Sequence, residues 1–138
     1  MPDTIRKVNY AYLATASRPG EAARILETLH AANVYLHAFS GFPQGRKKAQ
    51  IDLVTDNLDA LKAAARRQKW KLSRIKRAFL VQGMDHVGAA VPSLSKLGRA
   101  NINVTAAYAI AAGEGRFGMI FWVAPGDYNR AAKLLDAA

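Results

Sequence analysis

An α+β fold made of two consecutive βαββαβ units with antiparallel sheets is predicted by the sequence. Three observations lead to this prediction. The chain of 138 residues matches itself after one constant shift, both halves show the same order of strand and helix patterns, and 51% of the residues are hydrophobic against 22% charged. This length allows one average domain or two very small ones, and the composition is typical of globular proteins. We therefore expect one unit in residues 1–73 and a second in residues 74–138.

The repeat needs no gap between its two clearest markers. Gly20 falls on Gly88 and Asn33 falls on Asn101, an interval of 68 in both cases (88 − 20 and 101 − 33). The same shift places Leu26 on Leu94, Leu29 on Leu97, Ala32 on Ala100, Val34 on Ile102, Asp59 on Asp127 and Ala63–Ala64 on Ala131–Ala132. Because apolar and turn-forming positions are those that a fold dictates, the shift indicates a structural duplication.

The first half shows strands at period two and helices at period 3.6. Asn33 is expected to end the first helix, and Asp56 to cap the second. The predicted elements are, in order, a strand at Tyr10–Ala16, a turn at Ser17–Gly20, a helix with Ile25, Leu26 and Leu29, a strand at Val34–Ser40, a hairpin loop at Gly41–Lys48, a strand at Ala49–Thr55, a helix with Leu58, Leu61 and Ala65, and a short strand near Trp70–Ser73.

The second half repeats this order, so each half has the ferredoxin-like arrangement. Its predicted elements are a strand at Ala78–Gln82, a helix at Val87–Leu97, strands at Ile102–Ala109 and Phe117–Ala124, and a helix at Asp127–Leu135. Pro92 lies about one turn into the first of these helices and is expected to kink it. Ala138 corresponds to Trp70, so the second unit lacks its last strand: either its sheet has three strands of its own, or the linking strand serves both units.

Alternation along the strands predicts which residues face the helices. Val34, Leu36, Ala38, Ile51, Leu53, Met119 and Phe121 are expected to point inward, and Tyr35, His37, Phe39, Ile120 and Trp122, with Tyr10 and Tyr12, to point away. Such an apolar outer face is larger than a soluble monomer usually leaves bare. We therefore expect it to be covered by packing between the two units or by a second chain, which would make a homodimer.

Composition excludes several classes of site. There is no Cys, which removes disulfides, thiolate metal sites and Cys nucleophiles, and the three His residues are scattered. No metal or other cofactor is therefore expected. No apolar run approaches the ~20 residues of a membrane span and no signal peptide is visible, so we expect a cytoplasmic protein. The acids form no recognisable catalytic constellation, which favours a non-enzyme. The GxGxxG pattern at Gly113–Gly118 precedes a strand, so it predicts a hairpin loop, not a dinucleotide site.

The net charge of +10 raises the question of an anionic partner. A dense basic stretch runs from Lys62 to Arg77 with Trp70 inside it, and Arg46–Lys48 adds a loop cluster. Nucleic-acid binding is therefore the alternative function, although the aromatic-rich RNP1 signature is missing. A solvated basic face explains the same charge without any partner.

Two copies of one motif resemble the ACT domain, a family of small regulatory modules that bind amino acids. The motif reads Arg18-Pro19-Gly20, Leu26, Leu29 and Ala32-Asn33-Val34 in the first half, and Asp85-His86-Val87-Gly88, Leu94, Leu97 and Ala100-Asn101-Ile102-Asn103 in the second. The copies cover nearly the whole chain, as in stand-alone tandem ACT proteins. The resemblance implies a non-catalytic regulatory protein that binds an amino acid where two ACT-like units meet.

The candidate ligand-binding residues belong to these motifs. Glycine allows close backbone approach, the first turn of a helix has free N–H groups for a carboxylate, and an Asn side chain offers both a carbonyl and N–H donors. The candidates are Arg18, Pro19, Gly20 and Asn33 in the first unit, and Asp85, His86, Val87, Gly88, Asn101 and Asn103 in the second. The alternative is structural: the glycines serve only turn geometry and the Asn residues are helix C-caps. We favour the second unit because it carries more polar groups.

Overall fold

The structure is a computed structural model that describes residues 3–138. Its elements are β1 (Thr4–Ala16), α1 (Glu21–Ala31), β2 (Ala38–Gln44), β3 (Lys48–Val54), α2 (Leu58–Gln68), β4 (Lys76–Met84), α3 (Val91–Arg99), β5 (Val104–Gly113), β6 (Arg116–Val123), the 3-10 turn η1 (Pro125–Asp127) and α4 (Tyr128–Leu135). Hydrogen bonds connect the strands in the order β2-β3-β1-β4-β6-β5. The predicted α+β class, with antiparallel sheets and two ferredoxin-like units, is confirmed.

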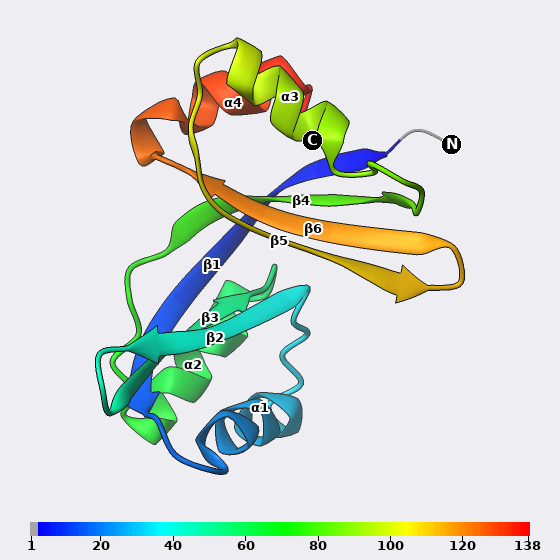
Figure 1. The fold of residues 1–138 in the computed structure, drawn as a ribbon. Helices are drawn as coiled ribbons and strands as arrows, with labels where there is room; N and C mark the ends of the chain where they lie inside the picture. Colours follow the sequence, from blue (N-terminus) through cyan, green and yellow to red (C-terminus); the bar gives the residue numbers. More distant parts are fainter. Residues whose placement is uncertain (1–2) are drawn as a thin grey trace. The chain divides into compact units, whose positions relative to one another are not determined.

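The chain forms two compact units. The first unit is Asn9–Lys76, and the second unit is Arg77–Ala138 together with the chain up to Val8. Strand β1 therefore contributes its C-terminal half to the first unit and its N-terminal half to the second. In each unit both helices lie on one side of that unit's strands (Figure 1).

The inward-facing residues of β3 and β6 are those that the alternation predicts, but the prediction for β2 is wrong: Phe39 pairs with Leu53 and shares its inward face, and Ala38 lies on the other face. In the first unit Ile51 and Leu53 pack with the helix residues Ile25, Leu29 and Leu61 in one core. In the second unit Met119 and Phe121 pack with Leu97 of α3 and with Tyr128, Ala131 and Leu135 of α4. The ring of Tyr128 stacks on Phe79 with centroids 4.4 Å apart, and its hydroxyl donates to the carbonyl of Ala78 at 2.8 Å. Both helices of each unit therefore bury their apolar faces against the same sheet face.

The second unit has no last strand of its own, and the N-terminal half of β1 takes that place. In the strand order β1 lies next to β4, and Thr4 Oγ1 donates to the carbonyl of Gln82 at 3.4 Å. On the other edge of β1, the Lys7 N–H donates to the Ala138 carbonyl at 2.9 Å and the Ala138 N–H to the Ile5 carbonyl at 3.0 Å. The strand that completes the second unit thus comes from the start of the chain and not from the segment that links the halves.

The shift of 68 holds for the strands but not for the second helix of each unit. Ala11 pairs with Leu53 as Phe79 pairs with Phe121, which is the same register 68 positions on. In the second helices the matching features are 67 apart: Leu61 and Tyr128 are buried, Ala64 and Ala131 are buried, and Lys69 and Asp136 end the helices in the left-handed conformation. The matches of Asp59 with Asp127 and of Ala63–Ala64 with Ala131–Ala132 are therefore wrong by one residue.

Helix α3 begins at Val91 and not at Val87, so the predicted kink at Pro92 is wrong. Pro92 lies in the first turn of the helix, where a backbone N–H has no helical partner to lose. The second helix of the first unit is capped by Asn57, whose side chain accepts from the Ala60 N–H at 3.2 Å, and not by Asp56. The carboxylate of Asp56 instead lies 2.7 Å from His37 Nε2.

Strand β2 begins and ends four residues later than the predicted Val34–Ser40, and β5 begins two and ends four residues later than the predicted Ile102–Ala109. Gly41 and Pro43, expected in a hairpin loop, lie within β2. Proline is tolerated there because β2 is an edge strand, where one side of the backbone needs no partner. The short strand predicted near Trp70–Ser73 is wrong, because residues 70–75 form no regular strand, although the Ser73 N–H donates to the Tyr12 carbonyl at 2.8 Å.

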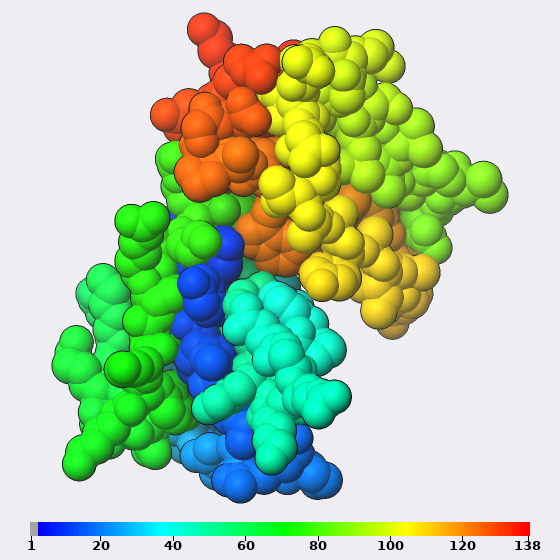
Figure 2. Space-filling view, turned by 60° about the vertical axis from the view of Figure 1, so that its left-hand side comes forward, coloured from blue at the N-terminus to red at the C-terminus, as the bar shows by residue number. Residues whose placement is uncertain are grey.

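The predicted outer face is covered only in part. Ile120 and Trp122 are buried, and the Trp122 ring meets the Tyr108 ring edge-on at 5.9 Å. Tyr35 and Phe39 remain 72% and 50% exposed. Exposed residues also run along β5, whose atoms lie at the surface of the second unit in yellow to gold (Figure 2).

Candidate functional site

The two copies of the motif open their helices differently. In the first unit Gly20, with φ of 87°, is the N-cap of α1, and Glu21 is the first helical residue. Pro19 therefore lies just outside the helix. In the second unit Gly88, with φ of 78°, is followed by an extra turn before α3 begins at Val91. Both glycines adopt a left-handed conformation that residues with a Cβ rarely enter, so both satisfy the turn geometry that the sequence predicts.

The first unit already holds a carboxylate at the start of α1. Glu21 accepts hydrogen bonds from Arg18 Nε at 3.0 Å, Arg24 Nη2 at 2.6 Å and Thr15 Oγ1 at 3.1 Å. The hydrogen bonds from Arg24, then Arg18 and Thr15, lower the pKa of Glu21 to about 2. The candidate ligand residue Arg18 is thus paired with an acid of its own helix. Glu21 was not among the predicted site residues; the signal for it was an acid directly after the motif glycine.

The second unit has no such carboxylate. The position equivalent to Glu21 is Ala89, 68 residues later, and the first turn of α3 contains no acid. Asp85, His86, Val87 and Gly88 are all exposed. This turn therefore presents its groups, the Asp85 carboxylate among them, to solvent.

Backbone hydrogen bonds hold the turn of the second unit in place. The Asp85 N–H donates to the Gly115 carbonyl at 2.8 Å, and the Ala89 N–H to the His86 carbonyl at 3.0 Å. His86 Nδ1 lies 2.9 Å from the Val87 carbonyl. The Val91 N–H donates to the Gly88 carbonyl at 2.9 Å. The side chains of Asp85 and Val87 are exposed on a backbone that these hydrogen bonds hold in place. Within the described residues Asp85 makes no ion pair.

The hairpin beside this turn adds a cation that the sequence analysis missed. Glu114 and Gly115 form the two-residue loop between β5 and β6, both with positive φ, as expected for a tight hairpin. The predicted hairpin is confirmed, but its loop is shorter than the predicted Gly113–Gly118, because Arg116–Gly118 belong to β6. Arg116 follows the loop and pairs with Met84, the residue before Asp85. A guanidinium and a carboxylate are thus carried by adjacent strand ends, a proximity that only the pairing of β4 with β6 creates.

Asn33 and Asn101 have a structural role at the ends of the helices. Both adopt the left-handed conformation, with φ of 58° and 59°. After α1 the Asn33 N–H donates to the His30 carbonyl and the Val34 N–H to the Leu29 carbonyl; after α3 the N–H groups of Asn101 and Ile102 donate to the carbonyls of Gly98 and Leu97. These are the two bonds of a Schellman motif. The C-cap alternative of the sequence analysis therefore describes the backbone of both residues.

Within one unit the candidate residues form two separate groups. Asp85–Gly88 precede α3 and Asn101 and Asn103 follow it, so the nine-residue helix separates them by roughly 13 Å at 1.5 Å per residue. The eleven-residue α1 separates Gly20 from Asn33 by roughly 16 Å in the same way. The side chains of Asn33, Asn101 and Asn103 are exposed, and they make no hydrogen bond within residues 3–138. A single amino acid cannot contact both groups of one unit.

Residues 3–138 contain neither a cluster of metal ligands nor a membrane-spanning helix. No group of three or more His, Asp or Glu side chains is placed to hold a metal ion. No helix is both long and apolar enough to cross a bilayer.

Comparison with known proteins identifies the fold. No protein-family model and no curated protein matches the sequence. Among solved structures, a protein from Bacteroides thetaiotaomicron is 16% identical, with a TM-score of 0.73 over 97% of this chain and 88% of that one. The regulatory subunit of aspartate kinase from Thermus thermophilus is 11% identical, with a TM-score of 0.63 over 99% and 95% of the two chains. The same subunit from Thermus flavus is 15% identical, with a TM-score of 0.59 over 98% and 94%. The chain thus has the tandem ACT-type fold that its motifs resemble.

The Schellman role of Asn101 predicts how substitutions there affect stability. Alanine must adopt the left-handed conformation, so Asn101→Ala is expected to lower the free energy of unfolding by about 1 kcal/mol. Asn101→Gly adopts it without strain and should stay within about 0.5 kcal/mol of the parent. Urea denaturation measures both, with Asn103→Ala as the exposed control. Equal stability of the Ala and Gly variants would show that the backbone conformation is not what Asn101 supplies.

The hydrogen bonds of Glu21 predict a pH dependence of stability. The pKa of this carboxyl lies at about 2 in the folded protein and near 4.5 without its partners. Its contribution is therefore complete above pH 4.5 and is lost as the pH falls toward 2. Between pH 5 and pH 2 the unfolding midpoint of the parent should fall more steeply than that of Glu21→Gln, and more so at low salt. Glu27→Gln on the same helix is the control and should follow the parent; if Glu21→Gln follows the parent as well, the carboxylate is not held as described.

Proposed function

We propose that this protein is a non-catalytic regulatory protein that binds an amino acid at the β4–α3 turn of its second unit. The observation that carries the proposal is the contrast between the two copies. The first unit places the carboxylate of Glu21 at its helix start, and the second unit has Ala89 at the equivalent position. A ligand carboxylate would occupy in the second unit the place that Glu21 occupies in the first.

The residues around this turn suit a zwitterion. An α-amino acid carries an anion and a cation, and Asp85 and Arg116 offer a partner for each from neighbouring strand ends. Gly88 allows close approach of the ligand to the backbone. His86 and Val87, which is fully exposed, would contact the ligand side chain.

A further ACT-like unit would complete the site. Asn101 and Asn103 lie at the far end of α3, so they would contact a ligand held by the turn of another unit and not one held by their own. The same holds for Asn33 relative to Arg18, Pro19 and Gly20. We assign the first unit a supporting role, because its own Glu21 competes with a ligand carboxylate for Arg18.

The regulatory role is supported by the proteins whose structures are similar to this one. Two of the similar structures are regulatory subunits of aspartate kinase. We propose that this chain likewise responds to a small ligand and passes the response to a partner.

We also propose that the protein is a homodimer through β5. This strand lies at one end of the strand order, and its sequence, VTAAYAIAAG, contains no charge and no proline. The strand at the opposite edge, β2, contains Pro43, which hinders pairing with a strand of another chain. Two copies of β5 can pair antiparallel about a two-fold axis, which satisfies the free backbone groups of both. Ile110, 70% exposed, and Tyr108 would then be covered.

Ligand binding is tested by a thermal-shift screen of the twenty amino acids, followed by calorimetry. At least one amino acid should raise the melting temperature, because a ligand that binds only the folded state stabilises it. Asp85→Asn should weaken its binding roughly ten- to a hundredfold, the effect of about 1.5–3 kcal/mol for one charge-assisted hydrogen bond.

Asp59→Asn is the matched control for this experiment. It removes the same charge from the first turn of α2 in the other unit and should leave the affinity unchanged. If no amino acid shifts the melting temperature at about 10 mM, the ligand class is wrong. If both Asp variants bind as tightly as the parent, the ligand lies elsewhere.

The dimer is tested by sedimentation of the parent and of Ile110→Lys. The parent should sediment as a dimer at micromolar concentration, and the variant as a monomer, because a buried lysine at the pairing strand is left without a partner. Leu134→Lys, on the exposed side of α4, should remain dimeric. A monomeric parent, or a dimer that Ile110→Lys leaves intact, contradicts pairing through β5.

A further inference from the structure

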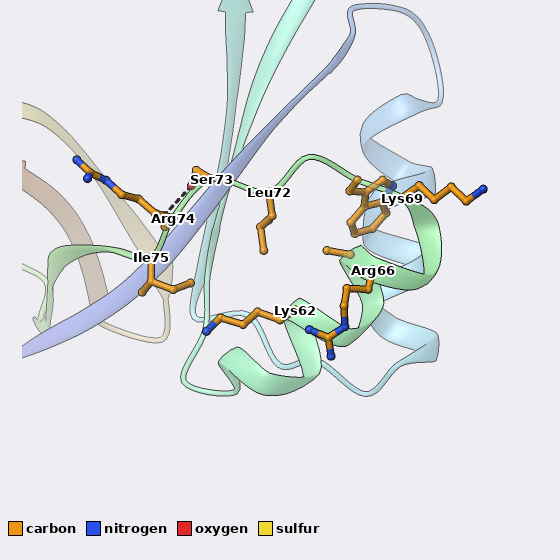
Figure 3. A pocket seen from close by; sticks show the side chains of 9 residues that line it. Lys62, Arg66, Lys69, Leu72, Ser73, Arg74 and Ile75 are labelled. Carbon is orange, nitrogen blue, oxygen red and sulfur yellow. Dashed lines mark hydrogen bonds between the residues drawn. The ribbon is translucent and has the colours of Figure 1, made fainter.

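A pocket of about 560 Å³ lies in the first unit between α2 and the segment that follows it. It is lined by Lys62, Ala65, Arg66, Lys69, Trp70, Leu72, Ser73, Arg74 and Ile75. In Figure 3, Leu72 and Ile75 point toward α2, and Lys62 and Arg66 extend from α2 beneath them. Its volume falls in the range of about 300–1,000 Å³ that small-molecule sites occupy.

The floor of the pocket is apolar and held in place. Trp70, Leu72 and Ile75 pack against the core of the first unit with their inner sides and line the pocket as well. The Trp70 N–H donates to the Ala65 carbonyl at 2.9 Å, which closes the end of α2. Ser73 bonds to Tyr12 through both its N–H and its side-chain oxygen. The pocket is therefore formed by the fold before any ligand arrives.

The rim of the pocket is cationic. Lys62 and Arg66 lie one turn apart on α2, Lys69 is the left-handed C-cap of that helix, and Arg74 lies near the other end of the segment that follows. Within residues 3–138 none of these four cations forms an ion pair, and no acid lines the pocket. Lys62 and Arg66 are like charges four residues apart, a pair that destabilises a helix, although Arg66 also lies in the last turn, where a cation favours the helix dipole.

The second unit supplies an internal control for this cationic rim. Its equivalent helix positions, 67 residues later, are Asn129 for Lys62, Lys133 for Arg66 and Asp136 for Lys69, and Ala137 stands for Trp70. The same helix thus forms and ends in the same way without most of these cations and without the indole. The positive charge and the aromatic ring are features of this one pocket and not of the repeated fold.

We propose that this pocket binds a phosphorylated small molecule with a flat apolar body, of the size of a nucleoside phosphate. The apolar floor would take the ring, and Lys62 and Arg66 would pair with the phosphate groups. A single-stranded nucleic acid is the weaker fit, because it needs a series of aromatic side chains for successive bases and this pocket has one. The site is separate from the amino-acid site proposed above and does not depend on it.

Calorimetry at about 150 mM salt tests the proposal with the ribonucleoside triphosphates, adenosine, inorganic phosphate and a twelve-nucleotide single-stranded DNA as probes. At least one triphosphate should bind saturably, and adenosine and phosphate alone should bind at least about tenfold more weakly, because each lacks half of the contacts. The double variant Lys62→Glu/Arg66→Glu should lose at least about tenfold in triphosphate affinity.

The matched control is Arg46→Glu/Lys47→Glu in the β2–β3 hairpin. It also reverses one Arg and one Lys, so both double variants change the net charge from +10 by −4 to +6. The control should stay within about threefold of the parent. Equal losses in the two variants would mean that only net charge attracts the anion. Tighter binding of the DNA than of every triphosphate, or no binding of any triphosphate, would overturn the small-molecule site. If the first double variant unfolds, Lys62→Gln/Arg66→Gln answers the same question.

Discussion

The pairing of β1 is the constraint on which the rest of the structure depends. This one strand of thirteen residues opens the first unit with its C-terminal half and closes the second with its N-terminal half. A strand with buried sides must pair its backbone groups on both edges. The N-terminal half of β1 lies beside β4 and bonds to Ala138, and its C-terminal half pairs with β3 and bonds to Ser73. Both units therefore need β1 to complete their folds, although the sequence repeat suggests two units that are each complete in themselves.

Function in a duplicated chain arises where the copies differ. The pairs β1–β3 and β4–β6 keep one register, although β5–β6 has irregularities that β2–β3 lacks, and the first helices of both units end in the same Schellman motif. Two differences between the copies concern the helices: Glu21 against Ala89 at the first helix, and Lys62 with Trp70 against Asn129 with Ala137 around the second. Since the fold tolerates either member of each pair, these positions are free to specialise. The two proposed sites accordingly lie in different units, one where an anion is missing and one where cations are in excess.

Much of the fold could be predicted because burial imposes a period on the sequence. The inward residues Ile51, Leu53, Met119 and Phe121 follow from alternation alone. The start of α3 could not be predicted, because the turn after Gly88 obeys local backbone hydrogen bonds that leave no apolar period. The one-residue slip in the second helices was hidden for a related reason: Asp59 and Asp127 match by identity, but the buried faces that define the helices are set by the sheet beneath them.

The sequence by itself determined the duplicated architecture, the inward faces of the strands and the glycines that need a left-handed turn, because each is a local or periodic demand on residue type. Tertiary structure alone decided that the start of β1 completes the second unit and that β4 pairs with β6, which places Arg116 opposite Met84, the residue before Asp85. It also decided that Lys62, Arg66 and Trp70 line one pocket. The strand pairings join residues far apart along the chain, and the pocket depends on how the irregular segment after α2 packs back on that helix, and neither leaves a spacing that can be read in the sequence.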